Sequence, residues 1–392
     1  MTDAAHLRRL NLDRVLSAAM ARPGAFTRAE LIEVTGLSAP TVGSLASFLI
    51  RAGLLVDLGA GPSRGGRRPS RMQFNARHGF AAGIDLGPTR TRLAIADLRG
   101  ELLARRIVAT PAFKTPVELL TTLANELRAL LRESDVPPAR LLAVAAGAPG
   151  VVDPDKGVVG LSPNLPGWSQ VPMAEILADA LRTTVVVDND VNMAVLGEHW
   201  KGVAHGHDTC AFLSFGTGIG AGILLKGELY HGHHFLAGEI GLMCMGPQYV
   251  GEETAARGTL EAITGLRALK ARWKGDAPSN GDWIAGLFCA SRSGDARARE
   301  ILHEAATFIG IATANVCSVL DPSLVVLGGA LLAGGALLEP VRGIVSRFIP
   351  MPAMIVTTSL DKDAPLWGSV LVATKEARER LRQQLGRSRA AG

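Results

Sequence analysis

The chain has 392 residues, of which 47% are hydrophobic and 20% are charged. This length and composition can build a large buried core and exceed one typical domain, so we expect at least two domains and exclude disordered and fibrous classes. The formal net charge is +5, but residues 1–80 alone carry eleven arginines and five acidic residues, a net charge of +6. Basic charge concentrated in one short segment indicates a polyanion as its partner.

The apolar stretches and the cysteines indicate the cellular compartment of the protein. The longest nearly uninterrupted apolar stretch, 324–338, is broken by glycine pairs and ends at Glu339, whereas a membrane helix needs about 18 apolar residues. Charged residues near the N-terminus leave no apolar run for a secretory signal. We therefore expect a cytoplasmic protein with no membrane span. The cysteines form no C-x-x-C pair, so we predict neither a disulfide framework nor a zinc knuckle. They are Cys210, Cys244, Cys289 and Cys317.

Two helices are predicted at the start of the chain. Residues 7–21 have apolar positions at helical spacing before a Pro-Gly pair, which predicts a first helix. Thr27 followed by Glu30 is a capping-box pattern, so a second, short helix is expected at 28–35, closed by Gly36.

A third helix is expected to begin after Ser38, which can cap it, and to end at Arg51. A short helix, a glycine turn and a second helix form the layout of a helix-turn-helix, in which the second helix enters the major groove. The side chains expected at the groove are mostly small, which indicates modest direct base readout. They are Ser38, Ala39, Thr41 and Ser44, with Ser47 on the same helix.

A wing is predicted after these helices. Residues 54–58 and 71–74 are expected to be strands, joined by a loop at 59–69. Glycines in the loop let the backbone lie close to a duplex, and guanidinium groups can bind phosphates or enter a narrow minor groove. The DNA-binding residues expected there are Arg64, Gly65, Gly66, Arg67 and Arg68. The alternative is a helical hairpin followed by a solvated loop.

From residue 80 onward, short apolar strands alternate with helices, which predicts an α/β architecture. Strands expected at 81–85 and 92–97 enclose a turn that contains Asp85, Gly87 and Thr89. This turn can offer a carboxylate, backbone N–H groups and a hydroxyl to a phosphate or its metal ion. Asp-Gly turns are also common in plain hairpins.

A glycine run at 215–222 is a second candidate phosphate site. Glycine at alternate positions leaves one strand face bare, so that phosphate oxygens can reach main-chain N–H groups around Gly216, Thr217 and Gly218. A dinucleotide fingerprint would be followed by a helix, but residues 223–227 are predicted to be a strand and a turn, so we reject a Rossmann nicotinamide site. The alternative is a hairpin that needs glycine only for close packing.

A third cluster follows the apolar strand expected at 185–187, ahead of a helix through Glu198. Ligands of open α/β sheets bind beyond the carboxyl ends of strands, where Asp190 is expected. Its carboxylate can accept the proton of a sugar hydroxyl, either as a base or as a hydrogen-bond acceptor. Because Asp188 and Asp190 can also cap the following helix, we expect the two roles to be divided between them.

Taken together, the motifs resemble the ROK family (repressors, open reading frames and sugar kinases), and specifically its repressor branch, which includes the N-acetylglucosamine and xylose repressors. The resemblance covers nearly the whole chain. Besides the motifs above, it is carried by 147–150, 162–165 with Trp168, 189–192, 238–241 and 327–329.

The resemblance implies the fold and the domain boundaries. The expected fold is an N-terminal winged helix-turn-helix followed by the two-lobed, actin-like and hexokinase-like ATPase fold of the family, with a ligand cleft between the lobes. The DNA-binding domain is expected at 1–75. The first lobe is expected at 76–188, completed by a C-terminal helix at 366–392, and the second lobe at 189–365.

The resemblance also implies site residues. Sugar hydroxyls would be contacted by Asn164, Asn189, Asp190, Glu239 and Glu261, whose amides and carboxylates offer paired donors or acceptors. Asp190 matches the catalytic base of the kinase members. The phosphate or nucleotide site would comprise Asp85, Gly87, Thr89, Gly216, Thr217, Gly218, Gly328 and Gly329.

The chain departs from the family pattern at two places. Family members typically have a histidine where this chain has Leu242, followed by a cysteine cluster that binds structural zinc, but here that stretch has Cys244 as its one cysteine. We expect no metal site and no cofactor. Pro88 replaces a second glycine of the phosphate turn, which removes a backbone N–H and should impair phosphoryl transfer more than sugar binding. A histidine cluster nearby is expected to be a solvated loop at the ligand's edge: His231, His233 and His234.

These observations predict a sugar-responsive repressor of carbohydrate-metabolism genes rather than an enzyme. Its expected partners are double-stranded operator DNA, a sugar or phosphosugar effector, and further copies of itself in a dimer or tetramer. An effector that is a partner protein stays open. The alternative function is an ATP-dependent sugar kinase that retains a DNA-binding arm, with residual activity through Asp190.

Overall fold

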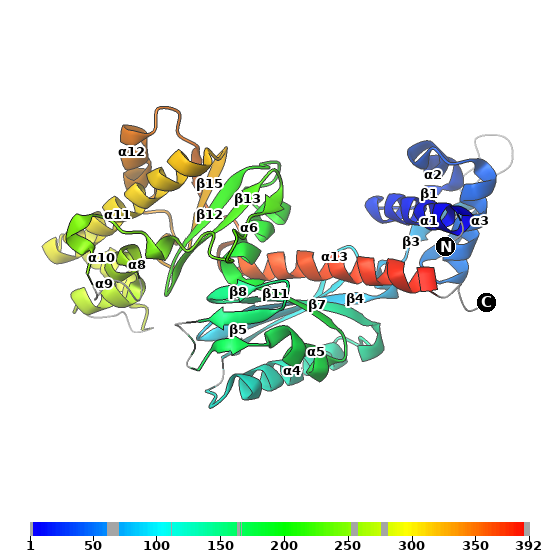
Figure 1. Cartoon of the computed structure of the whole chain (residues 1–392), viewed down its shortest axis with the longest axis horizontal. Helices are drawn as coiled ribbons and strands as arrows, with labels where there is room; N and C mark the ends of the chain where they lie inside the picture. The colour runs from blue at the N-terminus through cyan, green and yellow to red at the C-terminus, as the bar shows by residue number, and fades with distance from the viewer. Residues whose placement is uncertain are drawn as a thin grey trace.

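The computed structural model describes residues 3–60, 70–110, 112–162, 165, 167–251, 258–275 and 281–387. An N-terminal unit lies at one end of an elongated molecule, and two α/β parts, each built on a five-stranded sheet, form the rest (Figure 1). No helix within the described residues is long and apolar enough to cross a membrane.

The N-terminal unit contains helices α1 (Asp3–Ala21), α2 (Arg28–Thr35) and α3 (Ala39–Arg51). The capping box predicted for α2 is confirmed: the Thr27 hydroxyl accepts the Glu30 N–H, and the Glu30 carboxylate accepts the Thr27 N–H at 2.6 Å. Gly36 ends α2 with φ of 65°, a left-handed conformation that favours glycine. Helix α1 begins four residues earlier than the apolar pattern predicted.

Helix α3 packs its apolar face on the other two helices. The buried side chains are spaced as one helical face requires: Val42, Leu45, Ala46 and Leu49. The predicted cap by Ser38 is wrong in one detail. Its hydroxyl is hydrogen-bonded to the Thr41 hydroxyl at 2.8 Å, and no capping bond to a backbone N–H of α3 occurs among the described residues.

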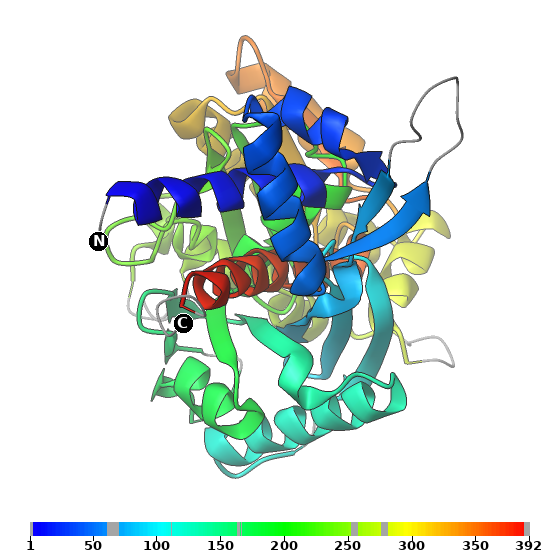
Figure 2. The same ribbon diagram turned by 90° about the vertical axis from the view of Figure 1, so that its right-hand side faces the viewer.

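The predicted wing begins as a hairpin of β2 (Leu55–Ala60) and β3 (Ser70–Phe74), which project from the unit in Figure 2. A short strand that the sequence did not predict, β1 (Phe26–Thr27), pairs with β3 to complete a sheet in the order β1-β3-β2. The helices and the hairpin thus have the order of a winged helix-turn-helix. Residues 61–69, which include the predicted DNA contacts of the wing, lie outside the described part of the chain.

The first five-stranded sheet has the order β11-β7-β4-β5-β6. Strands β4, β7 and β11 run parallel, and β5 and β6 are antiparallel to their neighbours. Helices α4 (Pro116–Glu133) and α5 (Met173–Leu181) cover one face, and α13 (Ala364–Arg387) covers the other (Figure 1). The strands are β4 (Phe80–Leu86), β5 (Arg90–Asp97), β6 (Leu102–Ala109), β7 (Leu141–Ala148) and β11 (Thr184–Asn189), and a small separate sheet contains β8 (Val151–Asp153), β9 (Val158–Leu161) and β10 (Ser169–Val171).

The second five-stranded sheet has the order β14-β13-β12-β15-β16. Its strands are β12 (Cys210–Phe215), β13 (Ile219–Leu225), β14 (Glu228–Leu229), β15 (Leu324–Gly328) and β16 (Met354–Thr357). One face packs on a helical layer with its own apolar core. That layer contains α8 (Thr259–Thr264), α9 (Leu266–Arg272), α10 (Trp283–Arg292), α11 (Ala296–Leu320) and α12 (Leu338–Phe348).

Helix α6 (Asp190–Lys201) lies between the two sheets, against α13 (Figure 1). Glycines allow the two helices to touch backbone to backbone. A Cβ on Gly197 would lie 2.1 Å from the Ala364 carbonyl oxygen, and one on Gly368 would lie 1.8 Å from the Met193 carbonyl oxygen. Because strand β11 leads directly into α6, the end of one sheet is joined to the helix that packs beneath the other.

Candidate functional site

A cavity of about 260 Å³ lies at the carboxyl ends of strands from both sheets. This is where open α/β sheets bind ligands. The predicted residues that it brings together come from four separate segments of the chain: Asn189, Asp190, Gly216, Thr217, Gly218, Glu239 and Glu261. Asn164 was predicted to belong with them but lies outside the described residues.

The junction of β11 and α6 supplies Asn189 and Asp190. The helix cap predicted for the aspartates is made by Asn189 instead, whose side-chain oxygen accepts the N–H groups of Val191 at 2.7 Å and Asn192 at 3.2 Å. Its side-chain N–H group donates to the Gly150 carbonyl at 2.9 Å. The amide is therefore held rigidly, and the Asp190 carboxylate is released from capping and lines the cavity.

Three carboxylates face the cavity and affect one another. Burial raises the pKa of Asp190 to about 7, and the nearby charges of Asp85 and Glu239 add to this rise. Burial, together with the charge of Glu261, raises the pKa of Glu239. Glu261 accepts the backbone N–H of Ile219 at 3.0 Å, which fixes its orientation. The cluster can accept hydrogen bonds from several hydroxyls, and Asp190 is poised to exchange a proton near neutral pH.

The glycine run forms the hairpin between β12 and β13, so the predicted strand after it is confirmed. Its glycines serve two purposes. A Cβ on Gly216 would meet nothing closer than 3.7 Å, and this residue lines the cavity. A Cβ on Gly222 would lie 2.4 Å from the Val191 carbonyl oxygen, so this position needs glycine for packing on α6. The ligand and packing explanations therefore apply to different ends of the run.

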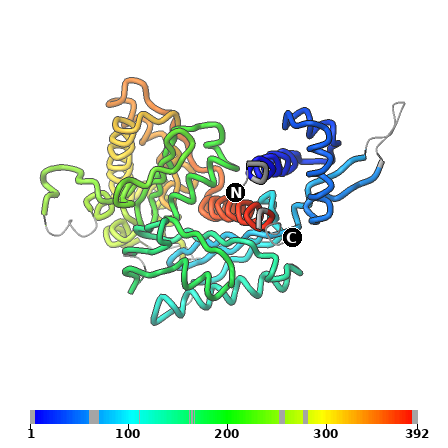
Figure 3. Tube along the Cα trace, turned by 45° about the vertical axis from the view of Figure 1, so that its right-hand side comes forward, coloured from blue at the N-terminus to red at the C-terminus, as the bar shows by residue number. Residues whose placement is uncertain are grey.

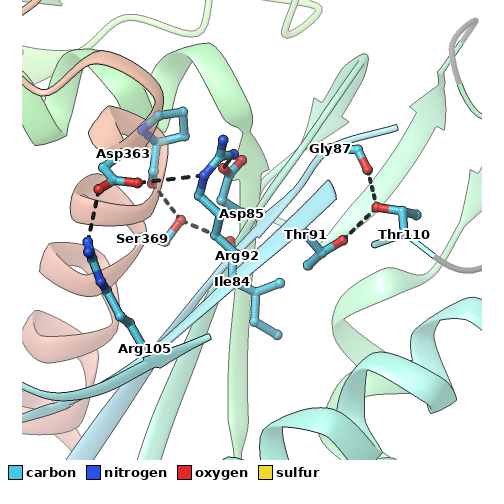
Figure 4. Close-up of polar contacts among 10 residues, drawn as sticks. Ile84, Asp85, Gly87, Thr91, Arg92, Arg105, Thr110, Asp363 and Ser369 are labelled. Atoms are coloured by element: carbon cyan, nitrogen blue, oxygen red, sulfur yellow. Dashed lines mark hydrogen bonds and ion pairs between the residues drawn. The ribbon is translucent and has the colours of Figure 1, made fainter. Parts of the chain in front are cut away.

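In the turn predicted to hold phosphate, the Asp85 side chain pairs with another residue of the protein. The Asp85 carboxylate pairs with the Arg92 guanidinium at 2.8 Å, and the Arg92 Nε lies 3.6 Å from Asp363 (Figure 4). Burial raises the pKa of Asp85 to about 6, although Arg92 opposes that rise. Arg92 was not among the predicted site residues. The signal existed, because a tight turn at 87–90 places Arg92 opposite Asp85 in the β4–β5 register.

Several backbone groups of this turn are also bonded internally. The Gly87 N–H donates to the Arg90 carbonyl at 3.2 Å. The Gly87 carbonyl accepts the Thr110 hydroxyl at 2.7 Å, as Figure 4 shows. The Thr89 carbonyl accepts the Thr110 N–H at 2.9 Å. Pro88, which has no N–H, is the residue of this turn that lines the cavity. Asp85, Gly87 and Thr89 are not part of the described cavity lining, and their predicted phosphate contacts stay predictions.

Gly328 and Gly329 also lie outside the lining that the described residues form. Gly328 ends β15, Gly329 follows it, and both pack closely on β12. A Cβ on Gly328 would lie 2.3 Å from the Phe212 ring, and one on Gly329, whose φ is 88°, would lie 2.4 Å from the Phe215 carbonyl oxygen. Close packing is thus sufficient to explain both glycines.

His231, which follows β14 of the second sheet, contacts Asp188 of β11 in the first sheet. His231 Nε2 lies 2.8 Å from the Asp188 carboxylate, which also accepts the Asn192 side-chain N–H at 2.9 Å. The hydrogen bond with Asp188 raises the pKa of His231, against the effect of burial. The sequence interpretation gave His231 no acidic partner, because the two residues are 43 positions apart. This contact joins the two sides of the molecule next to the cavity.

The described residues of the segment after Leu242 include few side chains that bind metal ions. Leu242 lines the cavity, half exposed. The Cys244 thiol is exposed and donates to the Gly246 carbonyl at 3.4 Å. Within the described ranges, no group of three or more His, Cys, Asp or Glu side chains is arranged to hold a metal ion. His233 and His234 stack edge to face in the exposed loop after β14, with ring centroids 4.5 Å apart.

A second candidate site is the outer face of α3 in the N-terminal unit (Figure 2). Ser38, Ala39 and Ser44 are exposed, and Thr41 is half-buried. Ser47 is half-buried and its hydroxyl donates to the Gly43 carbonyl at 2.8 Å, so it bonds within its own helix. The four residues predicted at DNA are therefore accessible on a helix whose opposite face is buried.

Comparisons with known proteins agree with this architecture. The ROK family model matches residues 81–376. The xylose repressor of Caldicellulosiruptor bescii is 29% identical over 334 residues, covering 82% of this chain and 84% of that protein. A glucokinase of Halalkalibacterium halodurans is 29% identical over 275 residues, covering 66% of this chain and 83% of that protein. A solved ROK family transcriptional regulator, described as a homologue of the E. coli MLC protein, has a TM-score of 0.77 at 20% identity and covers 97% of this chain and 99% of its own, so the two share a fold.

Proposed function

Because this chain belongs to the ROK family, we propose that it is a sugar-responsive transcriptional repressor of carbohydrate-metabolism genes. The N-terminal unit binds operator DNA through α3 and the wing, and the cavity binds the effector. The observation that carries the proposal is the presence, in one chain, of a carboxylate-lined cavity and an N-terminal unit with an accessible polar helix. Its similarity to a xylose repressor over 82% of the chain supports the same function.

The charge of the cavity favours a neutral sugar over a phosphosugar. Asp190, Glu239 and Glu261 line it, and among the described lining residues none is a lysine, arginine or histidine. A phosphate group would be repelled by these carboxylates, whereas sugar hydroxyls can donate to them. The effector is therefore an uncharged monosaccharide.

The closed turn after β4 favours a sensor over a kinase. Phosphoryl transfer needs charge stabilisation at the phosphates and their metal ions. Here the Asp85 carboxylate is neutralised by Arg92, and Gly87 is bonded within the turn. The kinase alternative is supported by one specific observation, the cavity-lining Asp190 with its pKa near 7, and by similarity to a glucokinase.

Calorimetry with sugars tests the proposal. The purified full-length protein is titrated with D-xylose and D-glucose, then incubated with ATP and Mg²⁺ while sugar products are followed by mass spectrometry. A bound sugar with no phosphorylated product, and DNA affinity that changes when the sugar is added, supports a sensor. A phosphorylated product that disappears in Asp190→Asn overturns it in favour of the kinase. In a sensor, the same variant keeps DNA binding and loses its sugar response.

We also propose that the protein acts as a homo-oligomer, a dimer or tetramer, because paired recognition helices fit a pseudo-palindromic operator. Light scattering of the protein alone and bound to DNA measures this. Two chains per operator duplex are expected, and one chain per duplex at saturation contradicts it.

A further inference from the structure

Helix α13 extends from between the two α/β parts to the N-terminal unit (Figures 1 and 3). It has 24 residues, so its ends are about 36 Å apart at the rise of an α-helix. The helix packs on the first sheet and on α6, and Arg382 near its end contacts the N-terminal unit. A single helix thus joins the part of the molecule next to the cavity to the N-terminal unit.

The cavity end of α13 is tied to the turn after β4. Asp363, the residue just before the helix, pairs with Arg105 at 3.2 Å and with Arg92 at 3.6 Å (Figure 4). Arg92 pairs in turn with Asp85 at 2.8 Å. This chain of ion pairs leads from the helix to a carboxylate close enough to Asp190 to influence its charge.

Helix α6 provides a second connection at the same end. It begins with the cavity residue Asp190 and touches α13 through Gly197 and Gly368, without side chains between the backbones. The buried Glu198 carboxylate also accepts the backbone N–H groups of Ser359 at 3.1 Å and Leu360 at 3.0 Å, just before α13. Contacts this tight transmit a displacement instead of absorbing it. A ligand that moves Asp190 therefore moves α13.

The far end of α13 is attached to the N-terminal unit. Arg382 donates to the Ser17 hydroxyl of α1 at 3.3 Å. Arg378 donates to the Leu98 carbonyl at 2.7 Å, and next to it Arg99 donates to the Met20 carbonyl at the end of α1. Apolar side chains of both helices, including Leu16 of α1 and Leu381 of α13, belong to one continuous core.

We propose that α13 is the link through which effector binding in the cavity repositions the DNA-binding unit, with Asp363 at its sensing end and Arg382 at its output end. This inference rests on the proposed function for its biological meaning. The mechanical coupling does not depend on it. We expect a perturbation at one end of α13 to alter the stability of α1 at the other end, and we assign the output to the Arg382 contact.

Hydrogen exchange tests this in the full-length protein without any ligand. The rate of amide exchange in α1 is measured by mass spectrometry for wild type, Asp363→Asn, Arg382→Ala and the double variant. We expect Asp363→Asn to raise the exchange rate of α1 about fivefold or more, the range of ordinary allosteric coupling. In the Arg382→Ala background, Asp363→Asn should cause no further rise in the exchange rate of α1. Arg105→Ala, which removes the same pair from the exposed side, should act like Asp363→Asn.

Matched controls exclude a general loosening. Glu339→Gln breaks an exposed pair with Arg342 on α12, and Arg297→Ala breaks one with Glu300 on α11. Both should leave α1 exchange unchanged. The proposal is overturned if Asp363→Asn and Arg105→Ala raise the exchange rate of α1 no more than these controls do. It is also overturned if Asp363→Asn raises that rate as much in the Arg382→Ala background as in wild type. Failure of the protein to bind D-xylose or D-glucose would instead count against the proposed function and leave this result standing.

Discussion

The Arg92 guanidinium lies 2.8 Å from the Asp85 carboxylate, and both side chains are largely buried, 16% and 6% exposed. A carboxylate in a phosphate-binding turn must be free to meet a ligand or its metal ion. Here it has a buried cationic partner from the next strand, which supports the proposal that this turn serves structure.

Replacing Arg92 should reveal what this pair contributes. Arg92→Ala leaves a buried carboxylate without its partner, so the free energy of unfolding should fall by about 3 kcal/mol. Urea denaturation measures the change. The double variant Asp85→Asn with Arg92→Ala should recover part of the loss, because no uncompensated charge remains. Arg106→Ala, which removes more exposed pairs with Glu126 and Glu133, should cost under about 1 kcal/mol. Equal losses for Arg92→Ala and Arg106→Ala would contradict this account.

The glycine run should separate into two kinds of position. In Gly222→Ala the new Cβ meets the Val191 carbonyl oxygen at 2.4 Å, so overpacking should destabilise the protein by about 1–3 kcal/mol. In Gly216→Ala the Cβ enters open space, and stability should change by less than about 1 kcal/mol. Thermal melts of both variants make the comparison. A larger loss for Gly216→Ala would show that the packing explanation is assigned to the wrong end.

Stability should decrease with rising pH because of Asp190. Its pKa rises from 3.8 to about 7 on folding, so between these values the folded protein binds more protons than the unfolded chain. The free energy of unfolding therefore falls as the pH rises from about 4 to 7 and levels off above that range. Urea denaturation at several pH values should give a shallower slope for Asp190→Asn. Asp153→Asn, at a carboxyl whose pKa is lowered by Lys156, serves as a control, and an unchanged slope in Asp190→Asn would refute the assignment.

His231 adds a second dependence with the same sign at higher pH. The Asp188 partner raises the pKa of His231 above its ordinary 6.5. The stabilisation is fully present below pH 6.5 and is lost as the pH rises through the folded pKa. His231→Gln should flatten this part of the stability curve, whereas His234→Gln in the same loop should not. Direct titration of the histidine by NMR gives an independent check: a folded pKa at or below 6.5 would contradict the pairing.

The local patterns of the sequence predicted local structure well. The capping box at Thr27 and Glu30 gave the bounds of α2 because both partners lie within one turn. The absence of a helix after the glycine run likewise followed from residues 223–227 themselves. Signals of this kind depend on neighbours in the chain, which the sequence displays directly.

Contacts between distant segments were not predictable in the same way. Asp363 meets Arg92 across 271 positions, and His231 meets Asp188 across 43. Neither pair has a fixed spacing, since the folding of whole lobes brings the residues together. The capping role at 188–190 was assigned to the wrong residue for another reason. Asp and Asn cap equally well, and only the end of β11 decides which of them takes the cap position.

The accessible face of α3 gives the last prediction. Ser44 is exposed on this helix, opposite the buried face that contains Val42 and Leu45. Ser44→Glu should preserve the fold but place a negative charge against DNA phosphates, lowering DNA affinity about tenfold or more. Fluorescence anisotropy with duplexes selected by wild type from a random pool measures the affinity.

Thr121→Glu on exposed α4 is the matched control. Because the proposed sugar site is the separate cavity, calorimetry should give unchanged sugar affinity for Ser44→Glu. Loss of DNA binding in both variants would trace the effect to net charge, and full binding by Ser44→Glu would remove α3 from the interface.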